Sequence, residues 1–180
     1  MNRSHCALFA MGLMLCPQIN ASADDLAYNL EFTGTIVAQT CDIDISSLSQ
    51  SIDLGQFAVG DFPSTTTTKF KPFNINLKNC SRGITGAKIW FTGEPDPDNP
   101  ALLAITDTGM GSGNMLASGV GVEILNDDQD TISINNADSV VYPLKAGRNT
   151  LSFYIRYKST RPTVTSGNAT AVMYFDMQYE

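Results

Sequence analysis

Histidine is nearly absent from this sequence, since His5 is the only one in 180 residues. It lies in a segment that we expect to be removed, so the mature chain has no imidazole for catalysis or metal binding. After the first segment there is also no apolar run of roughly 18 residues, and we expect no membrane insertion of the mature chain. No internal repeat and no linker rich in Pro, Gly or Ser divides it. These absences favour one domain without a metal or a cofactor.

The first 23 residues have the layout of a secretory signal peptide. Basic Arg3 precedes an apolar stretch over residues 6–16, and the small residues Ala21, Ser22 and Ala23 come just before two aspartates. This apolar stretch is too short to span a bilayer of about 30 Å, but it has the length of a signal-peptide core. We therefore expect cleavage after Ala23 and export of the remaining 180 − 23 = 157 residues.

The mature chain is acidic. Removal of Arg3 changes the balance of charged residues from 11 − 18 = −7 to 10 − 18 = −8. A surface of this sign repels phosphate groups, which argues against nucleic acid or an anionic membrane as a partner.

Cleavage leaves only two cysteines, Cys41 and Cys80. In an exported protein a single pair predicts one disulfide. The pair has no C-x-x-C spacing, so a structural bridge is favoured over a redox centre.

The apolar pattern of the mature chain has period two almost throughout, which predicts an all-β protein built from many short strands. Turn-forming residues separate the expected strands, as in a sandwich or barrel. We expect strands over residues 26–38, 70–77, 87–92, 101–105, 119–125, 131–134, 140–143, 150–157 and 169–179.

Both terminal strands have one apolar face. In the first, the even-numbered positions form it: Leu26, Tyr28, Leu30, Phe32, Gly34, Ile36 and Ala38. In the last, the odd-numbered positions do so: Ala169, Ala171, Met173, Phe175, Met177 and Tyr179. Each strand is therefore expected to bury one side.

Several spacings together resemble the subunits of chaperone–usher pili. Gly167 is the fourteenth residue from the end and Tyr179 is penultimate, as in the C-terminal signature of these pilins. Gly34 precedes Cys41 by seven residues, which is similar to the glycine of the pilin donor strand. Residues 88–93, 119–125 and 144–154 also resemble the family, and the likeness covers essentially all of the mature chain. Residues 91–104 look most like the minor adaptor subunits of type 1 fimbrial tips.

The resemblance implies an incomplete immunoglobulin-like sandwich that lacks its last strand and is completed by a strand from a partner. It divides the chain into a signal peptide (1–23), an N-terminal donor strand extension (24–38) and a pilin domain (39–180). The missing strand would leave a groove bordered by the strand from Ala169 and by the chain around Cys41.

The resemblance also implies partners. A periplasmic chaperone would fill the groove first, and at the outer-membrane usher the donor strand of a neighbouring pilus subunit would replace it. The completed fibre would be a cell-surface fimbrium that supports adhesion. Partner-binding donor residues would be Leu30, Phe32, Gly34, Ile36 and Ala38. Chaperone-binding residues in the C-terminal strand and groove would be Gly167, Met173, Phe175, Met177 and Tyr179.

Alternatives remain for the first strand and for the function. Residues 26–38 could be an ordinary first strand of the chain's own sandwich. The chain could also be a receptor- or glycan-binding adhesin subunit, although two-domain tip adhesins of the resembled family are about twice as long. No constellation of residues suggests an enzyme.

Two further motifs have less specific interpretations. Residues 126–130 (Asn-Asp-Asp-Gln-Asp) resemble the start of a calcium loop but lack its glycine and glutamate, so a solvated hairpin turn is favoured. Trp90 is expected to be an aromatic residue of the core or groove.

Overall fold

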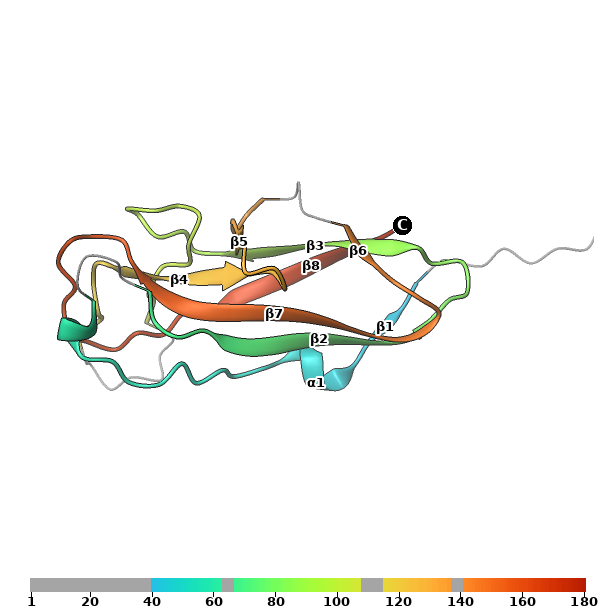
Figure 1. Cartoon of the computed structure of the whole chain (residues 1–180), viewed down its shortest axis with the longest axis horizontal. Helices are drawn as coiled ribbons and strands as arrows, with labels where there is room; N and C mark the ends of the chain where they lie inside the picture. The colour runs from blue at the N-terminus through green and yellow to red at the C-terminus, as the bar shows by residue number, and fades with distance from the viewer. Residues whose placement is uncertain (1–39, 63–66, 108–114, 137–140) are drawn as a thin grey trace, which may run out of the picture. The chain divides into compact units, whose positions relative to one another are not determined.

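The computed structural model describes residues 40–62, 67–107, 115–136 and 141–180, and these form a two-sheet β-structure (Figure 1). The expected signal peptide and donor strand extension, including Leu30, Phe32, Gly34, Ile36 and Ala38, lie outside the described residues. In the described part, the only helices are the one-turn α1 (Ile45–Leu48) and a 3-10 turn over Val59–Asp61. The prediction of an all-β protein is confirmed.

One sheet has five strands in the order β1-β2-β7-β4-β5, and all its pairs are antiparallel. Its strands are β1 (Asp42–Ile43), β2 (Lys71–Cys80), β7 (Gly147–Ser159), β4 (Val120–Leu125) and β5 (Thr131–Ile132). The register places Phe73 of β2 opposite Phe153 of β7. The same sheet pairs Glu123 of β4 with Arg156 of β7.

The second sheet has three antiparallel strands in the order β6-β3-β8. They are β6 (Val141–Pro143), β3 (Gly86–Gly93) and β8 (Met173–Tyr179). Ala87, Ile89 and Phe91 of β3 lie opposite Tyr179, Met177 and Phe175 of β8. Since side chains alternate along a strand, these six residues share the face that is turned toward the other sheet.

The core lies between the sheets and is built around three phenylalanine rings. Phe91 of β3 makes edge contacts with Phe73 and Phe153 of the five-stranded sheet, at centroid distances of 5.9 and 5.1 Å. Tyr142 of β6 adds a further edge contact to Phe153. Aromatic pairs in this geometry stabilise a core beyond the burial of their area.

The predicted disulfide is present. Cys41 and Cys80 are joined at an S–S distance of 2.07 Å across 39 residues of sequence. The bridge fastens the chain just before β1 to the end of β2, so the first described residues are held at the edge of the larger sheet.

Two local predictions need correction, and one short helix was not predicted. Residues 101–105 form no regular strand, and only Leu103 among them makes isolated bridges, to Pro95 and to Val122. Residues 169–172 do not belong to the last strand, because Thr170 bonds to Thr106 in a loop instead of continuing along β3. The helix α1 was not predicted, although Asp44 caps it by accepting a hydrogen bond from the Ser46 amide.

Candidate functional site

The strand β8 is an edge strand. One side of it is paired with β3 over seven residues, and the other side pairs with no strand in the described part of the chain. An unpaired edge presents backbone N–H and C=O groups that can pair with another strand. β1 occupies the corresponding edge of the larger sheet, where it pairs only with β2 among the described strands.

The inward side chains of β8 are only half-buried, unlike those of its neighbour. Met173, Phe175, Met177 and Tyr179 all pack against the core but remain partly exposed. On β3, the facing residues Ala87, Ile89 and Phe91 have exposed fractions of 0, 1 and 0%. Along its outer edge β8 is therefore less completely covered by the described residues than β3 is. We call Met173, Phe175, Met177 and Tyr179 the β8 edge cluster.

One end of this edge is tied to the N-terminal side of the structure. The Tyr179 hydroxyl donates a hydrogen bond of 3.0 Å to the carbonyl oxygen of Cys41. Burial raises the pKa of this hydroxyl. Tyr179 therefore stays neutral and joins β8 to the chain that enters β1.

The other end of the edge is held by a close approach of two backbones around Gly167. The amides of Ala117 and Asn168 donate hydrogen bonds of 2.9 Å to the carbonyls of Asn168 and Met115. A Cβ atom on Gly167 would lie 2.4 Å from backbone atoms of Met115, Leu116 and Ala117. The structure thus gives Gly167 a packing role, because only glycine leaves room for this contact.

The predicted site residues in the C-terminal strand are therefore brought together, with one exception. Met173, Phe175, Met177 and Tyr179 share one face of β8, whereas Gly167 lies outside that strand and contacts a neighbouring loop. An edge without a partner strand among the described residues, combined with partly exposed apolar side chains, is the arrangement that β-strand addition uses.

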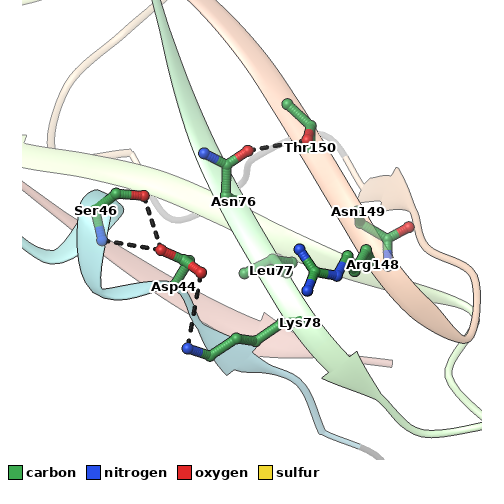
Figure 2. Close-up of a pocket in the computed structure, with 8 residues that line it drawn as sticks. All are labelled: Asp44, Ser46, Asn76, Leu77, Lys78, Arg148, Asn149 and Thr150. Carbon is green, nitrogen blue, oxygen red and sulfur yellow. Dashed lines mark hydrogen bonds and ion pairs between the residues drawn. The ribbon is translucent and has the colours of Figure 1, made fainter.

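A small polar hollow lies on the larger sheet beside α1 (Figure 2). It has a volume of about 220 Å³. In it, the Asp44 carboxylate accepts hydrogen bonds from Ser46 and lies 3.7 Å from the Lys78 ammonium group. These bonds, first of all the one from the Ser46 amide, lower the pKa of Asp44. Its lining residues are Asp44, Ser46, Asn76, Leu77, Lys78, Arg148, Asn149 and Thr150.

The sequence-based reasoning missed a buried carboxylate, Glu123, in β4. Its side chain is fully buried and bonds to Arg156 and Lys158 at 2.6 Å each and to the Thr131 hydroxyl at 2.8 Å. Burial alone would raise its pKa, but the bonds from Lys158, Thr131 and Arg156 outweigh burial and lower it. The signal was a lone acidic residue inside an otherwise apolar run over residues 120–125.

Two other expectations have clear outcomes. Trp90 lies between the buried Ile89 and Phe91 and so points away from the core, opposite Asp176; its placement in the core or groove was wrong. Asn126 and Asp130 close a hairpin turn between β4 and β5, as predicted. Among the described residues, there is no group of three or more His, Cys, Asp or Glu side chains that could hold a metal ion. No described helix is long and apolar enough to cross a membrane.

Comparison with known proteins agrees with this architecture. A family model described as fimbrial protein matches residues 30–180. An uncharacterized fimbrial-like protein of Escherichia coli K12, YcbU, is 44% identical over 154 residues, or 84% of each chain. Fimbrial subunit type 1 of Salmonella typhimurium is 34% identical over 84% of this chain and 82% of its own. The crystal structure of the P pilus rod subunit PapA superimposes with a TM-score of 0.66 at 22% identity, covering 78% of this chain and 99% of that one.

Proposed function

Because this chain belongs to the fimbrial protein family and is a structural subunit of a surface pilus, we propose that it assembles by strand exchange along the β8 edge. Residues 24–38 of a neighbouring subunit would pair with β8 and complete the immunoglobulin-like sandwich. The half-buried β8 edge cluster beside the fully buried inward residues of β3 (Ala87, Ile89 and Phe91) is the observation that carries this proposal.

The donor pattern fits such an edge. Leu30, Phe32, Ile36 and Ala38 share one face of the expected strand, so they can cover Met173, Phe175, Met177 and Tyr179. Burial of the three large side chains among them contributes about 1.5–3 kcal/mol each before the loss of chain entropy.

The remaining steps are part of the same proposal. A signal peptide cut after Ala23 would direct export. A periplasmic chaperone would then protect the β8 edge until, at the usher, the donor strand replaces the chaperone. An open apolar edge is prone to pairing with wrong partners, which gives a chaperone its physical role. The similarity of residues 91–104 to adaptor subunits suggests a minor position in the fibre, which the ratio of this chain to other subunits in purified fimbriae would test.

A synthetic peptide of residues 24–38 tests the exchange step. Added to the oxidised mature chain, it should raise the melting temperature and slow hydrogen exchange at the β8 amides, because these amides gain backbone partners. The matched control is the same peptide with Gly34→Trp, which should do neither. Unchanged exchange at β8 with saturating wild-type peptide would contradict the proposal.

A further inference from the structure

We propose that the end of the domain where β8 begins is a second contact surface in the fibre, on which the body of the strand-donating subunit rests. This inference depends on the proposed strand exchange and adds to it a body-to-body interface. The donating subunit is a second copy of this chain.

The described chain begins at the opposite end of the domain from this surface. The Ser81 amide donates a 3.0 Å hydrogen bond to the Thr40 carbonyl, and Tyr179 bonds to Cys41. Thr40 therefore lies where β8 ends. β8 begins at Met173, six residues earlier, which is about 20 Å away at the rise of an extended strand. The two ends are the Met173 end and the Tyr179 end.

The direction of the donor strand decides which end receives the donor's body. Every strand pair in both sheets is antiparallel, and antiparallel pairing is somewhat more stable per residue than parallel pairing. A donor strand antiparallel to β8 ends with its Ala38 beside Met173 of the acceptor. Because only Gln39 separates Ala38 from Thr40, the donor's domain must start directly at the acceptor's Met173 end.

Exposed apolar side chains occur at this Met173 end. We define the end patch as the five residues Phe57 (37% exposed), Val59 (43%), Met115 (82%), Leu116 (37%) and Val172 (44%). Scattered exposed apolar residues are common, but several at the end of an open edge indicate an interaction surface.

Contacts in the structure connect the parts of this patch. The carbonyl of Met115 accepts a hydrogen bond from Asn168, whose segment leads to Val172 and β8. The Phe57 ring lies 6.0 Å from the ring of Tyr157, and the Tyr157 hydroxyl bonds to the carbonyl of Ala169 in the same segment. Met115 and Phe57 are thus both linked to the segment that leads into β8, and a fixed arrangement reduces the ordering cost of association.

The resulting interface joins two different ends, the Met173 end of one subunit and the Tyr179 end of the next. Such a heterologous contact repeats along an open fibre and leaves one free surface at each end. The contact is therefore directional. A substitution in the end patch should lower a subunit's affinity for its neighbour when that subunit is the acceptor, but not when it is the donor.

Two differently labelled mature chains test this directionality. The donor's own β8 edge is filled beforehand with the residue 24–38 peptide, so that only the other chain can accept. Met115→Asp in the acceptor should leave its affinity for the peptide unchanged and lower its affinity for the full donor at least about tenfold. The same change in the donor should have no effect. Ile45→Asp, at a 77% exposed position on α1, is the matched acceptor control and should also have no effect.

The outcomes separate this inference from the proposed function. Equal affinity of wild-type and Met115→Asp acceptors for the full donor, with normal peptide binding, would overturn the end contact alone. Loss of peptide binding in Met115→Asp would show that the variant is damaged. In that case the affinities of a Val59→Asp acceptor for the peptide and for the full donor are compared instead. If the peptide does not bind even the wild-type chain, the strand-exchange proposal itself fails.

Discussion

At the scale of single residues, Glu123 is the most informative side chain outside the β8 edge. It is a fully buried carboxylate that Arg156, Lys158 and Thr131 all contact. A buried charge is stable only when its partners replace the lost water, so this cluster holds β4, β5 and β7 in one register. Register in turn fixes which faces of these strands reach the core.

We predict that Glu123→Gln lowers the free energy of unfolding by about 1–3 kcal/mol at neutral pH, because two cations lose a charged partner. The pKa of Glu123 is lowered in the folded protein from its ordinary value of 4.5. Its contribution is therefore fully present above about pH 4.5 and is lost as the pH falls through the lower, folded value. Urea unfolding at several pH values measures this, and the difference between wild type and variant should shrink in acid. Glu94→Gln, at an exposed position, should have little effect at any pH. A Glu123→Gln effect that does not change with pH would contradict the charge argument.

Gly167 allows a second test at this scale. Since an added Cβ would lie 2.4 Å from backbone atoms of residues 115–117, we expect Gly167→Ala to destabilise the chain by about 1–3 kcal/mol or more. Gly60→Ala is the matched control, because its Cβ would meet nothing within 4 Å. Thermal unfolding of both variants measures the difference. Equal melting temperatures would show that the 115–117 segment moves away freely.

At the scale of elements, the structure describes one open strand, and the sequence predicts a second strand that is complementary to it. Among the described residues, β8 has no partner strand along its outer edge and a half-covered inner face. Residues 24–38 lie outside the described residues, and their sequence pattern predicts one apolar face. Strand exchange between copies would pair the open edge of β8 with residues 24–38. The apolar face of residues 24–38 would then cover the half-buried side chains of β8.

We predict that Gly34→Trp blocks incorporation of the chain into fibres as a donor but leaves its own domain folded. Gly34 shares the apolar face with Phe32 and Ile36, so a ring there would overpack the partner's edge at a cost of about 1–3 kcal/mol or more. Thr35→Trp, on the other face, is the matched control and should assemble. Counting labelled subunits in isolated fibres measures incorporation, and disulfide content reports folding. Normal incorporation of the Gly34→Trp chain would refute the donor role of this face.

At the scale of the whole molecule, the disulfide restrains a loop of 39 residues. It fixes the first described residues to the larger sheet, close to the bond between Tyr179 and Cys41. The same bridge therefore holds the place from which a donor strand would leave the domain.

We predict that removal of this bridge, by reduction or in a Cys41→Ala, Cys80→Ala double variant, lowers the free energy of unfolding by roughly 4 kcal/mol, the value for a loop of this length. Urea unfolding with and without reductant measures the loss, and reductant should not change the double variant. Two titratable thiols per unreduced mature chain would contradict the pairing.

The sequence by itself determined the fold class, the disulfide and the alternation of β8. Period-two patterns and turn residues are local, and a single pair of cysteines in an exported chain leaves one possible bridge. The resemblance of several spaced motifs to those of chaperone–usher pilins was enough to indicate the family. The donor role of residues 24–38 rests on the same pattern and stays a prediction.

Only the tertiary structure decided which groups meet across the sheets. Trp90 faces away from the core because β3 alternates around Phe91, and sequence alternation alone does not say which face is inner. Gly167 leaves room for the backbone of residues 115–117, which lies far from it in sequence. Glu123 forms ion pairs with Arg156 and Lys158 of β7. The half-exposed inner face of β8 likewise depends on which strands pair with it. Local sequence fixes the character of each strand, whereas exposure, charge pairing and open edges are properties of strand order, which long-range contacts decide.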